Sequence, residues 1–259
     1  MRPAAVALAA LAGVLAPQCA AGGSDSGATP ATGRIRVVRT MPHDPRAYTQ
    51  GLLWHRGRLF ESLGGYGSSV LREIDPGSGA VLREVRLSDG EFGEGIATVG
   101  DRIYQLTWRE GTVRRWELPD LAAASALRFE GEGWGLAFDG ERLIQSDGTA
   151  TLTFREPSDF RALGAVRVLR EGRPAAYLNE LEWAGGSLFA NVWYSDEILE
   201  IDPASGEVVA TYDASVLVDA TERAQLDALN GIAWDPDEGL FYLTGKLWPK
   251  LFVVELSRD

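Results

Sequence analysis

The stretch NELEWAGGSLFANVW, residues 179–193, recurs in altered form four more times along the chain. The other copies are QGLLWHRGRLFESLG (50–64), EGIATVGDRIYQLTW (94–108), WGLAFDGERLIQSDG (134–148) and NGIAWDPDEGLFYLTGK (230–246). Each copy begins with a polar residue or Trp and continues with an apolar run, a turn containing Gly or Asp, and a second run with an aromatic or aliphatic pair. Because two short extended runs flank a turn, each copy predicts a β-hairpin.

Further strand-like runs follow each hairpin. The first set is SSVLREID (68–75), GTVRRWEL (111–118), ATLTFRE (150–156), DEILEID (196–202) and PKLFVVEL (249–256). The second set is AVLREVRL (80–87), SALRFEGE (125–132), GAVRVLRE (164–171) and EVVATYDA (207–214). Four strands in a repeat of 40–45 residues, with almost no helical periodicity, predict an all-β, five-bladed β-propeller with four antiparallel strands per blade.

The ends of the repeat predict how the ring closes. The fifth unit has no fourth run before the chain ends, and the early run RIRVVRTM (34–41) has no hairpin of its own. We therefore expect this N-terminal strand to be the outer strand of the last blade. The longest gap holds the amphipathic stretch SVLVDATERAQLDA (215–228), which predicts a short helix. A β-sandwich is the alternative fold, but it explains the regular period less well.

The N-terminus carries the pattern of an exported protein. Residues 1–21 combine Arg2, a short apolar run and small residues, which is typical of a signal peptide. A lipid anchor on Cys19 is the alternative, although Gln18 is a poor residue to precede a modified cysteine. We expect a flexible linker over 22–33, a catalytic propeller domain over 34–259, and a periplasmic or secreted protein.

Bulk properties limit the classes of partner. The formal net charge of −12 argues against nucleic acid, which needs clustered Lys and Arg. Apart from the short N-terminal run, no stretch is apolar enough for a transmembrane helix. Cys19 is the only cysteine, so no disulfide is expected. A closed propeller has no free edge that demands a partner, so a monomer is expected.

The repeat also predicts two rings of residues around the central axis. The first residues of the five copies line the inner strands of a propeller, and they are Gln50, Glu94, Trp134, Asn179 and Asn230. A second ring follows at the end of each hairpin, and its members are Gly64, Trp108, Gly148, Trp193 and Lys246. One acid, several amides, several Trp and one Lys at a common mouth are typical of a small-molecule or peptide-end pocket.

Each ring also has a structural interpretation. Polar side chains in a narrow channel can hydrogen-bond only water and one another. Lys246 can form a salt bridge with Glu180 or Glu94. Three further tryptophans, Trp54, Trp183 and Trp234, recur once per first strand and are expected to pack between blades.

Ten motifs in order along the chain resemble one known family. They are YTQGLLW (48–54), LFESLGGYGSS (59–69), FGEGIA (92–97), IYQLTW (103–108), GWGLAFDG (133–140), LIQSDGT (143–149), LNELEW (178–183), ANVWYSD (190–196), LNGIAWDP (229–236) and TGKLWPKL (244–251). With these residues the chain is similar to the plant-type glutaminyl cyclases, or glutaminyl-peptide cyclotransferases. These are five-bladed propellers with bacterial members, and the motifs cover the whole predicted propeller.

The resemblance implies an activity and a set of site residues. The activity is conversion of an N-terminal glutaminyl residue of a peptide or protein to pyroglutamate with loss of ammonia, without a catalytic zinc or other cofactor. The FGEG motif places the catalytic acid at Glu94. The other motifs place substrate-binding residues at Tyr48, Gln50, Trp108, Trp134, Asn179, Trp193 and Lys246. Tyr48 departs from the family's usual Phe, which keeps the ring and adds a hydroxyl.

Two other functional classes remain as alternatives. One is a non-catalytic propeller that binds a partner through the same mouth. The other is a metal-dependent, lactonase-type propeller hydrolase, which would use carboxylates and amides around a divalent ion on the axis. The first ring offers Glu94 as its only acid, and His43 and His55 are the only histidines, so a three-histidine metal site is not possible. A structural cation on the axis stays an open alternative.

Overall fold

The computed structural model describes residues 28–258, and these residues form an all-β protein with little helix. Two sheets follow the repeat in chain order. The first contains β2 (Thr49–His55), β3 (Arg58–Leu63), β4 (Val70–Ile74) and β5 (Val81–Arg86). The second contains β6 (Gly93–Val99), β7 (Arg102–Thr107) and β8 (Thr112–Glu117), with the short β9 (Ala122–Ala123) and β10 (Leu127–Arg128) both paired to β8.

The third repeat also makes its own sheet. It contains β11 (Leu136–Phe138), β12 (Leu143–Gln145), β13 (Thr151–Arg155) and β14 (Ala162–Arg167). A two-stranded ribbon of β15 (Leu169–Arg170) and β16 (Arg173–Pro174) follows. Consecutive strands within each unit pair antiparallel, as the hairpin pattern predicts.

The last two repeats share one sheet of eight strands. Its members are β17 (Leu178–Ala184), β18 (Ser187–Val192), β19 (Glu197–Ile201), β20 (Val208–Asp213), β21 (Leu229–Asp235), β22 (Leu240–Gly245), β23 (Lys250–Arg258) and β1 (Ala31–Pro42). Strand β1 joins the two units, because it pairs antiparallel with β23 and parallel with β20. The N-terminal strand therefore lies beside β23 of the fifth repeat, on the side away from β22, and also borders the fourth repeat through β20.

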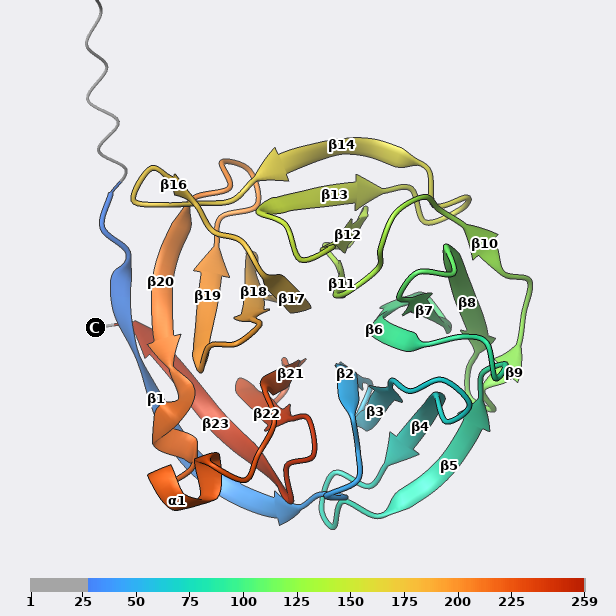
Figure 1. Ribbon diagram of the computed structural model, residues 1–259, viewed down its shortest axis with the longest axis horizontal. Coiled ribbons are helices and arrows are strands. Elements are labelled where there is room, and N and C mark those ends of the chain that lie inside the picture. The colour runs from blue at the N-terminus through green and yellow to red at the C-terminus, as the bar shows by residue number, and fades with distance from the viewer. Residues whose placement is uncertain (1–27, 259) are drawn as a thin grey trace, which may run out of the picture.

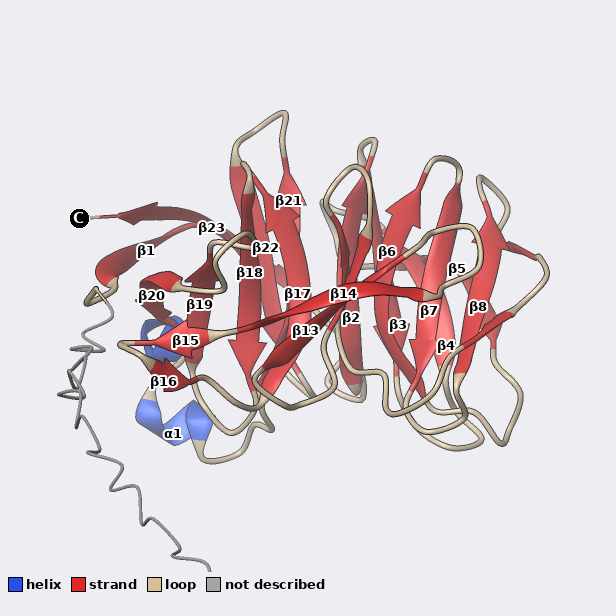
Figure 2. Cartoon of the chain, turned by 90° about the horizontal axis from the view of Figure 1, so that it is seen from above, coloured by secondary structure: helices blue, strands red, loops and turns tan. Residues whose placement is uncertain are grey.

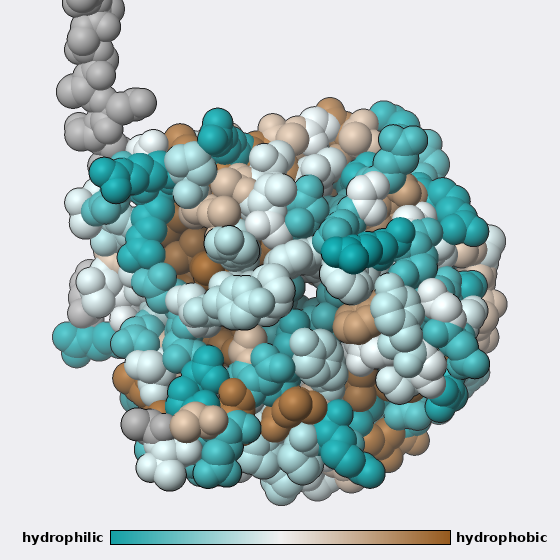
Figure 3. Space-filling model, viewed as in Figure 1, coloured by the Kyte–Doolittle hydropathy of each residue, from teal (hydrophilic) through white to brown (hydrophobic). Residues whose placement is uncertain are grey.

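The units lie around a common centre. Figure 1 shows β2, β6, β11, β17 and β21, the first strand of each repeat, nearest to that centre. Seen from above, these strands run between the two faces of the molecule (Figure 2). The innermost strands are almost entirely buried, whereas the outer strands β5 and β14 are mostly exposed. The face in Figure 3 is mostly hydrophilic, with hydrophobic residues scattered over it.

The core consists of clusters between neighbouring units. Trp54 of the first unit stacks on Tyr242 of the fifth, with ring centroids 5.0 Å apart. Trp183 packs against a cluster that includes Ala137 of the third unit, and Trp234 against one that includes Tyr212 of the fourth. The prediction that these three tryptophans pack between units is therefore confirmed.

Three predictions differ from the structure in detail. Strand β1 begins at Ala31, so the expected linker over 22–33 extends three residues too far. The fourth strand of the second unit, expected over 125–132, is reduced to the two-residue β9 and β10. Pro119 has no N–H to donate, and Leu121 has a positive φ of 56°, so regular pairing stops there.

The third difference lies in the insertion of the fourth repeat. The expected single helix over 215–228 consists of a 3-10 helix, Ala214–Leu217, and the short α1, Ala220–Arg223. Among the described residues, no helix has the length and apolar character needed to cross a bilayer. The expected signal peptide, residues 1–21, and the Cys19 lipidation site lie outside the described residues.

Candidate active site

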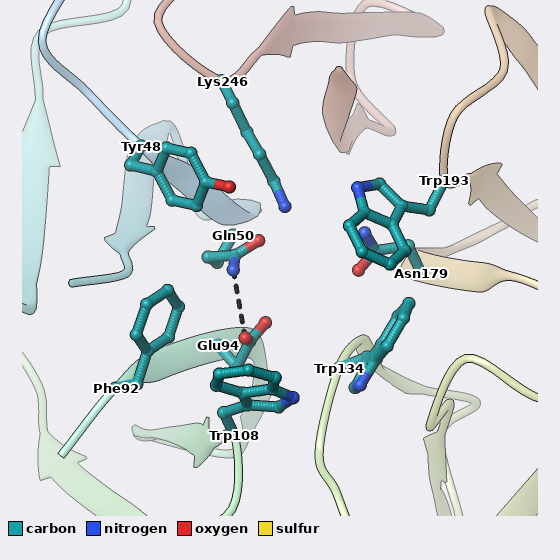
Figure 4. A pocket seen from close by; sticks show the side chains of 9 residues that line it. All are labelled: Tyr48, Gln50, Phe92, Glu94, Trp108, Trp134, Asn179, Trp193 and Lys246. Atoms are coloured by element: carbon teal, nitrogen blue, oxygen red, sulfur yellow. Dashed lines mark hydrogen bonds between the residues drawn. The ribbon is translucent and has the colours of Figure 1, made fainter. Parts of the chain in front are cut away.

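A pocket of about 250 Å³ opens where the inner strands of the units begin (Figure 4). All eight predicted site residues line it, and Phe92 is the ninth. The predicted residues are Tyr48, Gln50, Glu94, Trp108, Trp134, Asn179, Trp193 and Lys246. They come from all five units, so the structure brings together residues up to 198 positions apart in the sequence.

A repeated irregularity in the backbone marks the first ring. The register between the first and second strands of a unit shifts at Gln50, at Glu94, at Asn179 and at Asn230. A β-bulge places extra residues opposite one partner and re-aims a side chain. In four units the bulge therefore falls at the ring residue itself, where an ordinary pleat would direct alternate side chains to opposite faces of the sheet.

The residue after the ring position is Gly in four of the five units, at Gly51, Gly95, Gly135 and Gly231. A Cβ on Gly95 would lie 2.6 Å from the Trp134 carbonyl oxygen, and one on Gly135 would lie 2.0 Å from the Asn179 carbonyl oxygen. Real Cβ atoms do not come so close to backbone atoms. These glycines therefore allow the inner strands of neighbouring units to approach, and the Gly95 amide donates to the Trp134 carbonyl at 2.7 Å.

The fourth unit has Glu180 in this glycine position. Its carboxylate crosses toward two other units, where it accepts the Leu52 amide at 3.2 Å and the Ile232 amide at 2.8 Å. Burial and the neighbouring Glu182 raise the pKa of Glu180 well above its ordinary value. Because Glu180 is bound to backbone amides, the predicted alternative of a Glu180–Lys246 salt bridge is wrong.

Glu94 is the acid in the pocket, and it is 4% exposed. The Gln50 side-chain amide donates to its Oε1 atom at 3.0 Å. Burial raises the pKa of Glu94 well above its ordinary value, the positive charge of Lys246 lowers it, and the charges of Glu110 and Glu132 raise it again. Burial disfavours the charged form of a carboxyl group, so Glu94 holds a proton more readily than a surface acid does.

Lys246 extends into the same space as the Glu94 carboxylate (Figure 4). Its Nζ atom lies 4.9 Å from the Tyr48 ring centroid and 6.0 Å from that of Trp193, within range of a cation–π interaction. Burial lowers its pKa, and the charges of Glu94 and Asp227 act against that shift. Among residues 28–258 no carboxylate lies within ion-pair distance of Lys246, so the alternative of a direct Glu94–Lys246 salt bridge is also wrong.

Aromatic rings form the walls of the pocket. Trp134 and Trp193 meet edge to face with centroids 5.2 Å apart. Phe92 lies 5.6 Å from Trp108 and 6.3 Å from Tyr48, again in edge-on geometry. Aromatic pairs prefer such edge-to-face arrangements over face-to-face stacking. The result is a small apolar enclosure with a carboxylate, two amides and an ammonium group in it.

Comparison with known proteins shows which family this chain resembles. A family model described as glutamine cyclotransferase matches residues 5–256. The chain is 39% identical over 229 residues to the glutaminyl-peptide cyclotransferase of Arabidopsis thaliana, a match that covers 86% of this chain and 72% of that protein. It is 42% identical to the glutaminyl cyclase of Myxococcus xanthus, whose crystal structure superposes with a TM-score of 0.83 over 89% of this chain and 99% of that one.

The chain belongs to the glutamine cyclotransferase family. The family resemblance proposed from ten sequence motifs is thereby confirmed.

Not every ring residue of this cyclotransferase-family chain faces the pocket. Asn230 is fully buried beneath it, where its Nδ2 atom donates to the Thr49 carbonyl at 3.0 Å and to Gln50 Oε1 at 3.4 Å. It therefore supports Gln50 rather than lining the space. The two glycines of the second ring make room for aromatic rings, because a Cβ on Gly64 would meet Phe92 and one on Gly148 would meet Trp134.

Sequence reasoning missed Phe92, although the repeat contained the signal. Phe92 stands two residues before Glu94, just as Tyr48 stands two residues before Gln50. In both units the carbonyl at this position accepts the amide of the second-ring residue, from Gly64 to Tyr48 at 3.0 Å and from Trp108 to Phe92 at 2.9 Å. A third ring at this spacing would have found Phe92. Among the described residues, no group of three or more His, Cys, Asp or Glu side chains is arranged to hold a metal ion.

Proposed function

We propose that this chain is a glutaminyl-peptide cyclotransferase, which converts the N-terminal glutaminyl residue of a peptide or protein to pyroglutamate and releases ammonia. The observation that carries this proposal is the buried Glu94 carboxyl group, bound by Gln50 inside a small aromatic pocket. The relatives at 39% and 42% identity have names that state this activity or the corresponding cyclase.

The proposal also covers the fold, the oligomeric state and the location of the protein. The architecture is a five-bladed β-propeller in which β1 completes the last blade, supported by the five inner strands around one centre and by the pairing of β1 with β23. The chain would act as a monomer, exported to the periplasm or secreted after removal of residues 1–21. The reaction would need no cofactor, because the pocket itself offers a carboxyl group to move the proton and N–H donors for the carboxamide oxygen.

The reaction forms one bond and breaks one. The α-amine nitrogen of the substrate attacks the carbon of its own side-chain carboxamide, and the bond from that carbon to the amide nitrogen breaks. The amine loses one proton to become the lactam N–H, and the departing NH₂ group gains one to leave as NH₃. An N-terminal amine has a pKa of about 8, so part of it is already neutral near pH 7–8.

Glu94 has the position and the electrostatics to move this proton. It would accept the proton from the attacking amine as a general base and give it to the departing nitrogen as a general acid. Both steps are easiest when the pKa of the group lies near the working pH. The burial that raises the pKa of Glu94 moves it in that direction.

The other pocket residues would bind and orient the substrate. Lys246, Gln50 and Asn179 carry N–H groups that can donate to the carboxamide oxygen as negative charge develops there. Trp108, Trp134 and Trp193 would enclose the glutamine side chain and exclude water. Because the amine and the carboxamide already belong to one molecule, holding them in attack geometry mainly removes the rotamer freedom of the glutamine side chain, which is about 2 kcal/mol. The pocket volume of about 250 Å³ suits one side chain rather than a long peptide.

A coupled ammonia assay on a peptide such as Gln-Ala tests the proposal. The wild-type protein should release ammonia, and Glu94→Gln should fold normally yet lose activity by roughly 100-fold or more, because general acid–base catalysis typically contributes about 10²- to 10⁴-fold. Circular dichroism checks the fold of the variant. Near-wild-type turnover of Glu94→Gln would show that the proton is moved by another group.

Two controls separate the competing functional classes. Pretreatment with a strong chelator should leave activity unchanged, whereas activity that is lost and then restored by a divalent metal would favour the lactonase-type hydrolase. Binding of the Gln peptide without ammonia release would favour a non-catalytic propeller.

A further inference from the structure

Glu132 stands at the third-ring position of the third unit, two residues before Trp134. The same position holds Tyr48, Phe92, Tyr177 and Ala228 in the other units. Glu132 is therefore the one charged residue in a set that is otherwise aromatic or small. It does not line the pocket, and its side chain is 36% exposed.

One oxygen of Glu132 binds two tryptophans of the pocket. Its Oε2 atom accepts the indole N–H of Trp108 at 2.8 Å and that of Trp134 at 3.0 Å. Trp108 follows β7 of the second unit and Trp134 precedes β11 of the third, so the carboxylate bridges two units. The hydrogen bonds are charge-assisted, and such bonds are about twice as strong as neutral ones.

The second carboxylate oxygen of Glu132 is bound by Arg109. Its Oε1 atom accepts the Arg109 Nε–H at 2.9 Å, and the Arg109 guanidinium lies 3.7 Å from the centroid of the Trp108 ring. Trp108 is thus fixed by its N–H group and by a cation on its face. Burial raises the pKa of Glu132, but the hydrogen bonds from Trp134, Trp108 and Arg109 lower it below the ordinary value overall, so its acceptor form is the stable one.

The two hydrogen bonds to Glu132 restrict the orientation of the Trp108 and Trp134 rings in the pocket. Terminal torsions of aromatic side chains have broad, roughly two-fold wells, so packing alone leaves a ring free to change its tilt. A hydrogen bond at the indole nitrogen selects one orientation of each ring. We propose that Glu132 is a positioning residue of the cyclisation, which holds Trp108 and Trp134 in the orientation that folds the glutamine side chain toward its own amine. This inference rests on the proposed function.

The positioning role must be separated from a purely electrostatic one. The charged or polar groups that act on Glu94 are Gln50 from β2, Lys246 after β22, Glu110 between β7 and β8, and Glu132 before β11. Glu110 and Glu132 both raise the pKa of Glu94. Glu110, however, accepts the Phe92 amide and the Tyr66 hydroxyl, not an indole N–H, which makes it a charge-matched control.

Three variants separate the positioning role of Glu132 from its electrostatic effect: Glu132→Ala, Glu132→Gln and Glu110→Gln. All three remove a negative charge near Glu94, so each should lower its pKa and move the acid limb of the pH–rate profile to lower pH. Glu132→Ala should in addition lower the plateau of kcat/KM by roughly 10- to 100-fold, because misplacement by about 1 Å can cost about 10²-fold. Glu132→Gln keeps an acceptor oxygen and should recover most of the plateau, and Glu110→Gln should keep it in full.

Two outcomes would overturn the inference. If Glu132→Ala keeps the wild-type plateau and only shifts the acid limb, Glu132 acts as a charge alone. If Glu132→Gln loses as much as Glu132→Ala while Glu110→Gln does not, the Arg109 ion pair matters and the indole acceptor does not.

A titration of the wild-type protein tests the bridge without any measurement of activity. Indole N–H resonances of the eight tryptophans can be recorded by NMR and those of Trp108 and Trp134 assigned from Trp→Phe variants. The two resonances should move together with one midpoint below pH 4.5, as Glu132 takes up a proton. Independent or absent titration of the two indoles would contradict the bridge. Because this readout does not involve turnover, it stays valid if the protein releases no ammonia and the proposed function fails.

Discussion

At Glu94, the environment acts in two opposing directions. Burial raises the pKa of this carboxyl group, and the positive charge of Lys246 lowers it. Lys246 in turn is buried, which lowers its own pKa, while Glu94 acts to raise it. The two groups lie too far apart for a direct ion pair, but the charge of each one shifts the pKa of the other. A buried acid near a buried base of this kind is typical of catalytic sites.

Replacement of Lys246 by Gln should therefore move the pH dependence of the reaction. Without the positive charge, the pKa of Glu94 rises further, so Glu94 needs a higher pH to act as a base. The acid limb of kcat/KM should shift to higher pH, in addition to any loss of the plateau. The measurement is ammonia release across the pH range.

The second lysine of the chain supplies the control for this experiment. Lys250 pairs with Glu222 at 2.6 Å and is not among the pocket residues. Lys250→Gln should leave the acid limb in place. A limb that stays fixed or moves to lower pH in Lys246→Gln would show that the two pocket charges are not coupled.

At the scale of the strands, the site depends on close backbone approach. The bulge at Glu94 and the glycine that follows it bring β6 against the segment that carries Trp134. A side chain on Gly95 would collide with backbone atoms, which cannot rotate away. The FGEG motif therefore combines two functions: its acid lies in the pocket, and its second glycine lets two inner strands meet.

Gly95→Ala should lower both stability and activity. Overpacking a well-packed interior costs about 1–3 kcal/mol. Here the displaced atoms are backbone atoms of Trp134, Gly135 and Leu136, and Trp134 is a wall of the pocket. Urea unfolding and ammonia release measure the two effects. Gly164→Ala is the matched control, because Gly164 lies in the outer strand β14 with open space at its Cβ position. Equal stability of the two variants would contradict the close-approach interpretation.

At the scale of the whole molecule, the N-terminal strand β1 leads directly into a buried network of charges. His43 directly follows β1, and its Nε2 atom lies 2.8 Å from Glu61 Oε1 in β3. Glu61 is fully buried and also accepts the Thr49 hydroxyl at 2.6 Å and Arg72 Nε at 2.8 Å. His43 Nδ1 lies 2.7 Å from the Trp248 carbonyl, two residues beyond Lys246. The network thus connects the end of β1 with the first unit and the fifth unit.

The titration of this network predicts the pH range of greatest stability. Burial raises the pKa of Glu61, but His43 and Arg72 lower it to about 2, so its stabilisation is present above pH 4.5 and is lost as the pH falls toward 2. Burial lowers the pKa of His43, but Glu61 raises it above 6.5 overall. Its stabilisation is therefore full below pH 6.5 and is lost as the pH rises through the folded-state value. The midpoint of urea unfolding should thus be highest between about pH 4.5 and 6.5 if this network dominates.

Glu61→Gln tests that assignment. The change leaves Arg72 and His43 without their buried partner, and breaking a buried ion pair typically costs about 3–5 kcal/mol. The variant should also lose most of the pH dependence. Asp101→Asn removes one partner of the exposed Arg56–Asp101 pair and should change stability by about 1 kcal/mol or less. An unchanged pH profile in Glu61→Gln would mean that other groups control the stability.

Much of the fold and of the site could be predicted from the sequence because the information is repeated. Each hairpin gives the same local pattern, so five weak signals reinforce one another, and equivalent positions must meet around a common centre. For that reason the repeat alone groups Gln50, Glu94, Trp134, Asn179, Trp108, Trp193 and Lys246. Tyr48 came from the family motif alone. The broken outer strand of the second unit and the split helix were not predictable, because short edge elements depend on their neighbours rather than on periodicity.

The sequence by itself determined the units, their strands and the ring positions, since alternation of apolar residues and turn chemistry act within a few residues. Only the tertiary structure decided what each ring position does. Asn230 donates a hydrogen bond to Gln50, and the missing side chains of Gly95 and Gly135 let neighbouring inner strands approach. Glu180 accepts backbone amides of two other units. Glu132 accepts the indole N–H groups of two tryptophans. These roles depend on bulges and on contacts between different units, such as the Glu180 contact with the Ile232 amide at 2.8 Å and the Gly95 contact with the Trp134 carbonyl at 2.7 Å, and no local pattern encodes such distances.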